Sequence, residues 1–176
     1  MRFNSKGQAF DVFKLLIAAV IAIAMLAILL PIVKNLLPPG YSDPTSEAEN
    51  LIKNNIKYPS NYSESKEVVF TTEKNLNAKA IAGAGDVLNS NQLCLSKGDF
   101  EEDQDFELQE ASNNVILRYK GSTQRAKIGV ICDDGESLST DLQDYAQNVG
   151  ASYDMTCVGG EPSGAKTYCV LILRYV

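Results

Sequence analysis

The most acidic stretch of the chain is Gly98–Glu110, GDFEEDQDFELQE, and clustered carboxylates of this kind can bind calcium. On a β-strand, its alternating acids would share one face: Asp99, Glu101, Asp103, Asp105 and Glu107. The loop of an EF-hand needs glycine at its sixth position, where this stretch has Gln104. We therefore favour a solvated loop and strand edge over a calcium site, and we expect neither a metal nor a cofactor.

A second group of acids, Asp133-Asp134-Gly135, lies where a predicted strand gives way to a predicted helix. Catalytic acids occur at such junctions, but the tripeptide is also a common turn sequence. The chain has no histidine, so acid–base catalysis would fall on carboxylates alone. No nucleophile elbow, P-loop or dinucleotide-binding motif is present. We expect no enzyme and no catalytic residue, and the net charge of −6 without a basic stripe argues against nucleic acid.

Four cysteines form the third chemical feature: Cys94, Cys132, Cys157 and Cys169. Their even number predicts two disulfides and an external location, with free buried thiols or a four-thiolate metal site as alternatives. Residues 157–169 resemble two strands around a turn near Ser163, which would set Cys157 opposite Cys169. Cys94 with Cys132 then follows by elimination. Asn61-Tyr62-Ser63 is also a glycosylation sequon, in a predicted surface loop, which makes Asn61 a candidate for modification.

The elements that position these residues are mostly short strands. β-branched, aromatic or alternating patterns predict strands over 68–72, 78–82, 92–95, 106–109, 115–119 and 127–132, and a last hairpin of 151–158 with 166–176. A short helix should begin near Thr45, with Ser46 and Glu49 in capping-box spacing. Another should cover Ser137–Val149 and stop at Gly150. We therefore predict an α+β head that is mainly antiparallel, with one or two short helices.

The N-terminal part has a different composition. Leu15–Val33 is an uncharged run of 19 residues, and as a helix it would measure roughly 28 Å, close to the hydrocarbon core of a bilayer. Arg2 and Lys6 precede it, which favours a cytoplasmic N-terminus. We predict a long hydrophobic helix from about Ala9 to Leu37, bent at Pro31. The expected organisation is a leader over 1–7, the transmembrane or filament-core helix over 8–37, a hinge over 38–45 and the head over 46–176.

The residues Lys6-Gly7-Gln8, followed by one charged turn and then the apolar run, resemble the class III signal of type IV prepilins, in particular the archaeal branch. The resemblance covers about the first 37 residues. It implies that a prepilin peptidase cuts between Gly7 and Gln8 and that the pilus assembly machinery then packs the retained helices into a homo-oligomeric surface filament. One position differs: the family's acidic residue is usually fifth in the mature chain, whereas Asp11 would be fourth.

Several side chains of this segment are candidates for assembly contacts: Phe10, Asp11, Phe13, Lys14, Ala18, Ala22 and Met25. Small residues allow close helix approach, and Asp11 could pair with Lys14 or, across subunits, with a neighbour's new amino terminus. The expected function is a filament subunit, membrane-inserted before assembly, which displays its head for adhesion. The alternative is a single-pass, membrane-anchored extracellular binding domain that does not polymerise.

Overall fold

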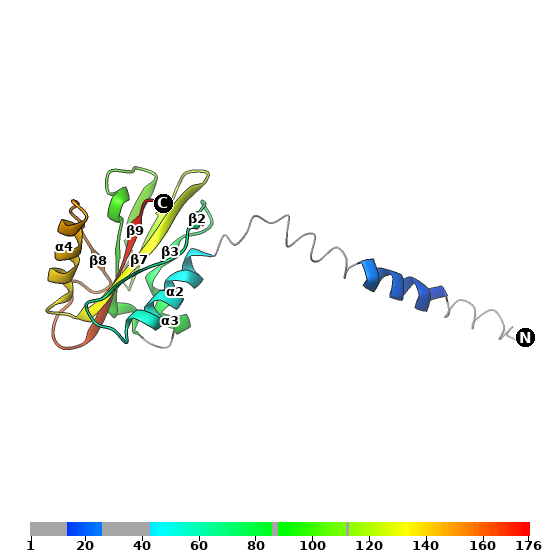
Figure 1. Cartoon of the computed structure of the whole chain (residues 1–176), viewed down its shortest axis with the longest axis horizontal. Coiled ribbons are helices and arrows are strands. Elements are labelled where there is room, and N and C mark those ends of the chain that lie inside the picture. The colour runs from blue at the N-terminus through cyan, green and yellow to red at the C-terminus, as the bar shows by residue number, and fades with distance from the viewer. Residues whose placement is uncertain (1–13, 26–42, 86–87, 112) are drawn as a thin grey trace, which may run out of the picture. The chain divides into compact units, whose positions relative to one another are not determined.

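The computed structural model describes residues 14–25, 43–85, 88–111 and 113–176, and its contacts divide the chain into two compact units. The first unit is Met1–Gly40 and the second, called the head below, is Tyr41–Val176. Figure 1 shows the elements of each.

The N-terminal unit contains a helix over residues 14–25 with every side chain exposed. Twelve residues make a helix of about 18 Å, whereas a membrane span needs about 20 residues. Within the described ranges, no helix is both long enough and apolar enough to cross a membrane. The expected long apolar helix from Ala9 to Leu37 is therefore wrong as a description of this structure. The prediction failed because an unbroken apolar run indicates hydrophobicity and does not fix the length of a helix. The other residues of the predicted helix lie outside the described part of the chain.

The head is α+β and is built on a six-stranded sheet of order β1-β7-β9-β4-β8, with β2 pairing beside β1 on β7. The strands are β1 (Tyr62–Glu64), β2 (Val68–Phe70), β4 (Leu93–Ser96), β7 (Gln124–Asp134), β8 (Thr156–Cys157) and β9 (Thr167–Arg174). All pairs are antiparallel except β4 with β9. The long strand β7 holds the sheet together, because β1 and β2 pair along one side of it and β9 along the other.

A second, three-stranded sheet has the order β3-β6-β5. It consists of β3 (Leu76–Asn77), β5 (Phe106–Ala111) and β6 (Asn114–Tyr119), all antiparallel. The predicted strands over 106–109 and 115–119 are thus confirmed. The predicted hairpin of 151–158 with 166–176 is wrong, since β8 pairs with β4 whereas β9 lies between β7 and β4.

The described part of the head has three α-helices, more than the one or two expected: α2 (Pro44–Asn55), α3 (Ala78–Gly85) and α4 (Leu138–Asn148). Helix α3 replaces the strand predicted over 78–82. Alanine is the strongest helix former, and the Asn77 side chain accepts a hydrogen bond from the Ala80 N–H at 3.0 Å, as a helix cap does. Two 3-10 turns, η1 (Ser90–Gln92) and η2 (Gly98–Phe100), flank β4.

The predicted start of α2 uses a different cap from the expected one. Asp43, not Ser46, caps α2, and its carboxylate accepts from the Ser46 N–H at 3.3 Å. Ser137 is the N-cap residue of α4, but its side chain makes no capping hydrogen bond. The Asp134 carboxylate accepts from the N–H groups of Glu136 and Ser137, at 2.9 and 2.8 Å, in the turn before the helix. An aspartate thus caps α2, whereas the Asp134 carboxylate orders the turn that leads into α4.

The core has two parts. The larger cluster contains Phe70, Phe100 and Phe106, with residues of α2, α3 and the second sheet. The smaller cluster lies beneath α4, where Leu138, Leu142 and Ala146 pack against residues of β7 and β9. Figure 1 shows α4 on one side of the main sheet and α2 and α3 on the other. The helical spacing read over Ser137–Val149 is confirmed by this packing.

Candidate functional site

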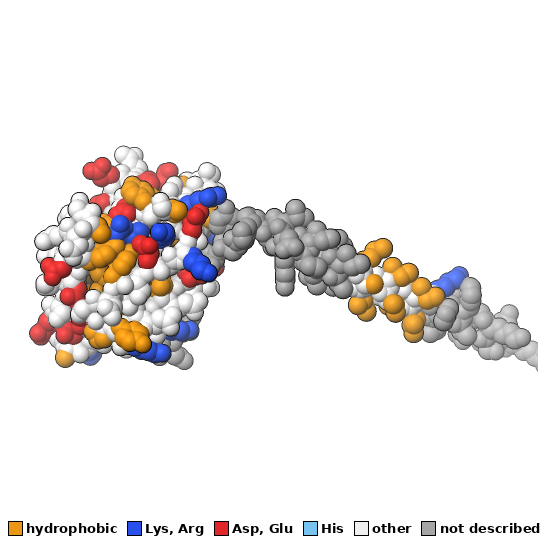
Figure 2. Space-filling view, viewed as in Figure 1, with side chains coloured by type: hydrophobic (Ala, Val, Ile, Leu, Met, Phe, Trp, Pro, Cys, Tyr) orange, Lys and Arg blue, Asp and Glu red, His pale blue; other side chains and the backbone are white. Residues whose placement is uncertain are grey.

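The residues expected to act in assembly fall into two groups. Lys14, Ala18, Ala22 and Met25 lie on the exposed helix 14–25. The others, and the processing residues, lie outside the described part of the chain: Lys6, Gly7, Gln8, Phe10, Asp11 and Phe13. On the helix, the exposed fraction is 71% for Leu15, 68% for Ile23 and 60% for Met25. Figure 2 shows hydrophobic side chains along the surface of this helix.

The two disulfides join Cys94 to Cys157 and Cys132 to Cys169. The expected pairs, Cys94 with Cys132 and Cys157 with Cys169, are therefore wrong. Each disulfide links directly opposite residues of neighbouring antiparallel strands, β4 with β8 and β7 with β9. The prediction failed because the last two strands do not form a hairpin with each other. The described residues contain no free cysteine.

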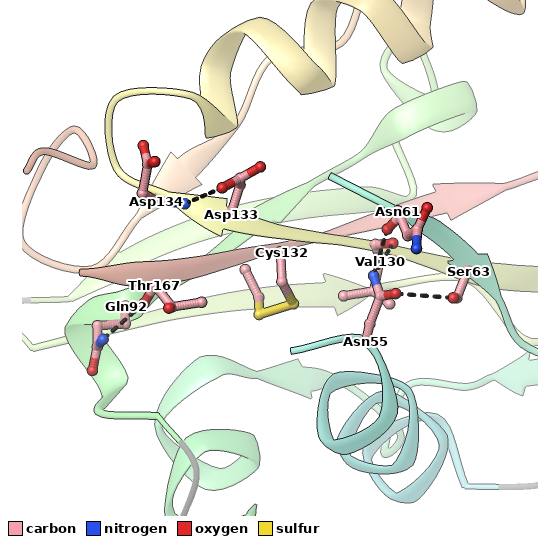
Figure 3. Close-up of a disulfide and its surroundings, with 10 residues drawn as sticks. Asn55, Asn61, Ser63, Gln92, Val130, Cys132, Asp133, Asp134 and Thr167 are labelled. Atoms are coloured by element: carbon pink, nitrogen blue, oxygen red, sulfur yellow. Dashed lines mark hydrogen bonds between the residues drawn. A yellow bond between two sulfur atoms is a disulfide. The ribbon is translucent and has the colours of Figure 1, made fainter. Parts of the chain in front are cut away.

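The two disulfides also lie on opposite faces of the main sheet. Cys132 and Cys169 belong to the larger core cluster, and both are fully buried. Cys94 belongs to the cluster beneath α4, and the partly exposed Cys157 packs against that cluster. Figure 3 shows the Cys132 disulfide within the sheet. Disulfides persist in oxidising compartments, so the pair is consistent with an extracellular or otherwise oxidising environment.

A buried asparagine that the sequence did not reveal joins three elements beside this disulfide (Figure 3). Asn55 ends α2 and is 2% exposed. Its amide nitrogen donates to the carbonyls of Asn61 at 2.7 Å and Val130 at 2.9 Å, and its side-chain oxygen accepts from the Ser63 hydroxyl at 3.0 Å. The network fixes α2 against β1 and β7. The Asn61 residue itself is exposed, and its glycosylation stays a prediction.

The acidic run does not form one charged face. Strand β5 begins only at Phe106, so the acids before it follow no strand alternation. Asp99 lies in η2 and forms a salt bridge of 2.9 Å with Arg174, whereas Glu107 pairs with Lys120 at 2.9 Å. No group of three or more potential ligands in the described ranges could hold a metal ion.

Asp99 is the centre of a polar cluster that sequence reasoning missed. Its carboxylate accepts from the Tyr153 hydroxyl, from Arg174 and from the Tyr175 N–H. Burial alone would raise the pKa of Asp99, but these three hydrogen bonds outweigh burial and lower it. The Arg174 guanidinium also lies 5.5 Å from the centre of the Tyr145 ring. The cluster therefore fastens the end of β9 to α4 and the segment after it.

Asp133 and Asp141 form the second polar cluster, at the end of β7. Burial would raise the pKa of Asp133, but hydrogen bonds from the Ser60 hydroxyl and the Asp134 N–H lower it. Burial and the neighbouring Asp133 both raise the pKa of Asp141. The Asp134 carboxylate orders the turn before α4, as described above. The tripeptide Asp133-Asp134-Gly135 thus ends β7 and begins the turn before α4 in this structure.

A groove of about 800 Å³ lies along β8. Its lining comes from α4, from the ends of β5 and β6, and from the segment over residues 153–162. Leu142, Tyr153 and Val158 form buried apolar parts of its wall, and Glu110, Asp154 and Glu161 are its charged residues. None of the described residues that line it is a lysine or arginine. Neither the cysteine pattern nor the acidic run indicated this groove, because α4 and β8 are distant in sequence from the ends of β5 and β6.

Comparisons of the chain with protein-family models, with curated proteins and with solved structures find no match.

Proposed function

We propose that the chain is a structural subunit of an archaeal type IV pilus-like surface filament. The observation that carries this proposal is the exposed apolar helix over residues 14–25. It follows the processing-type sequence Lys6-Gly7-Gln8, and the uncharged sequence continues to Val33. The N-terminal segment of the chain serves in assembly, and the disulfide-bonded head is displayed at the cell surface for adhesion.

The exposed helix supports the proposal because its apolar surface needs a cover. Removing apolar surface from water is worth about 25 cal/mol per Å², or about 1.5–3 kcal/mol for each large aliphatic side chain that is fully buried. Leu15, Ile17, Val20 and Ile23 offer such surface. Equivalent segments of neighbouring subunits provide a matching cover. Ala18 and Ala22, four residues apart, leave room for a close approach between helices.

The first test is the substitution Gly7→Val, which puts a branched side chain at the proposed cleavage bond. We expect the variant to accumulate with its leader attached and to be absent from filaments. The control is Gly40→Val, which makes the same change at the end of the N-terminal unit and should still be cleaved. N-terminal masses of surface protein measure both. Normal cleavage of the Gly7 variant would refute the assigned bond.

The second test is Ala18→Phe, which fills the space that close helix approach requires. We expect normal processing but a filament yield at least tenfold lower, because an added ring separates neighbouring helices. Ala165→Phe places the same ring at an exposed position of the head and should leave the yield unchanged. Filaments counted by electron microscopy give the answer. Equal yields for both variants would favour the unpolymerised binding domain instead.

A further inference from the structure

We propose that the free edge of strand β8 binds an extended peptide segment that carries lysine or arginine side chains. This binding surface belongs to the head, and it does not depend on whether the N-terminal unit polymerises. It would give the head a partner class: a cationic, extended protein segment.

The first observation is the position of β8 in the sheet. It is the last strand in the order β1-β7-β9-β4-β8, and its only strand partner within the described ranges is β4. Both of its residues, Thr156 and Cys157, line the groove. A strand at a sheet edge presents backbone N–H and C=O groups that no second strand pairs. In β8, the Cys157 carbonyl accepts one long hydrogen bond of 3.4 Å, from the Gly160 N–H of the same segment, which an added strand would replace. An extended peptide can pair with such groups and add a strand to the sheet.

The second observation is the shape of the groove around this edge. Leu142 of α4 and Val115 of β6 both line it, although they belong to core clusters on opposite faces of the main sheet. The groove therefore reaches both faces beside β8. Successive side chains of an added strand would point to these two faces in turn. The buried residues Leu142, Tyr153 and Val158 offer each face an apolar contact.

The third observation is charge. Between Lys127 and Lys166 the chain has seven acidic residues and no lysine or arginine: Asp133, Asp134, Glu136, Asp141, Asp144, Asp154 and Glu161. Asp154 and Glu161 of this set line the groove together with Glu110. In Figure 2, acidic side chains gather on the side of the head that carries α4. Lysine and arginine suit this setting, because their aliphatic stems cover apolar surface while their charged ends meet carboxylates.

The same charge argues against a second head as the occupant. The head carries far more acidic than basic side chains, and like charges brought together at an interface are unfavourable. The Cys94–Cys157 disulfide meanwhile anchors the two-residue strand β8 to β4. An edge that is already held in place loses little freedom when a peptide binds.

The test uses the full-length protein in a mild detergent, which covers its apolar N-terminal segment. The probe is a fluorescent ten-residue peptide in which lysine alternates with valine. A matched peptide replaces lysine with glutamate, and a third N-methylates alternate residues along one edge of the lysine peptide. Fluorescence anisotropy measures binding. We expect the lysine peptide to bind saturably and the glutamate peptide not to bind. The N-methylated lysine peptide should bind with a Kd at least tenfold higher than that of the lysine peptide.

A pair of double variants separates the groove from general electrostatic attraction. Asp154→Asn with Glu161→Gln removes two exposed charges that line the groove, and we expect Kd to rise about tenfold. Glu136→Gln with Asp144→Asn removes two exposed charges that do not line it, and Kd should change less than twofold. Equal effects of the two pairs, binding of the glutamate peptide, no binding at all, or no effect of N-methylation would each overturn the proposal. Self-association of heads that the first pair abolishes would identify a second copy as the occupant and overturn it too.

Discussion

The two units of the chain differ in whether their apolar side chains are buried or exposed. In the head, polar and apolar residues are interspersed, and the apolar ones meet in two core clusters on the faces of one sheet. In the helix over residues 14–25, every residue after Lys14 is apolar, and Leu15, Leu16, Ile17, Val20 and Ile21 stay exposed. A helix that is apolar all round needs cover on every side. The contrast shows that the head completes its own core, whereas the described helix of the N-terminal unit leaves its apolar side chains uncovered.

The strongest test of this contrast compares one large apolar side chain from each unit. Phe106 is 2% exposed, with its ring 4.8 Å from those of Phe100 and Tyr119. We expect Phe106→Ala to lower the free energy of unfolding by about 3–5 kcal/mol, because it leaves a cavity. Leu15→Ala should change it by less than about 0.5 kcal/mol. Denaturant unfolding of the full chain measures both, and similar losses would contradict the division.

A smaller effect is expected from the polar network that holds α2 to the sheet. Asn55→Ala should lower the free energy of unfolding by about 1–3 kcal/mol, because it leaves the Asn61 and Val130 carbonyls without their donor. The neighbouring Asn54 is exposed, so Asn54→Ala serves as the matched control with almost no change. Thermal unfolding of the two variants provides the measurement. Equal melting temperatures would show that the network contributes nothing to the head.

The smallest effect concerns pH. The pKa of Asp99 is lowered from 3.8 in the folded head, so its stabilising contribution is present above about pH 4 and is lost as pH falls through the folded pKa. Asp99→Asn should therefore destabilise the head at pH 7 and approach the parent stability at low pH. Unfolding measured from pH 7 to pH 2 checks this expectation, and a difference that does not shrink at low pH would contradict it.

Asp141 is a second carboxyl group whose pKa is shifted in the opposite direction from that of Asp99. Burial and Asp133 raise its pKa above 3.8. Its protonation therefore favours the folded state at low pH, and that stabilisation is lost as pH rises through the folded pKa. Asp141→Asn, which resembles the protonated form, should stabilise the head at pH 7. A loss of stability there would show that the charged form is the one the head prefers.

Local patterns predicted much of the head. The spacing of Leu138, Leu142 and Ala146 placed α4, and the β-branched run around Val130 placed β7. The order of strands in the sheet could not be read from the sequence, since pairing depends on contacts between distant segments. The incorrect disulfides follow directly from that gap, because the pairing of β8 with β4 decides which cysteines meet.

The candidate sites show the same limit. The apolar N-terminal run was evident from composition, but its length predicted a longer helix than the structure describes. Asn55, the Asp99 cluster and the groove along β8 each combine residues more than thirty positions apart. A sequence pattern reports the neighbours of a residue along the chain. It does not report which hydrogen-bond partners the fold brings to that residue.

The central claim is that the N-terminal segment is processed and then buried between subunits. The most direct measurement is the intact mass of the protein in filaments sheared from the cell surface. We predict filaments whose main subunit begins at Gln8 and retains the apolar run Leu15–Val33. A chain that still begins at Met1, recovered only as a monomer and absent from filaments, would contradict the account.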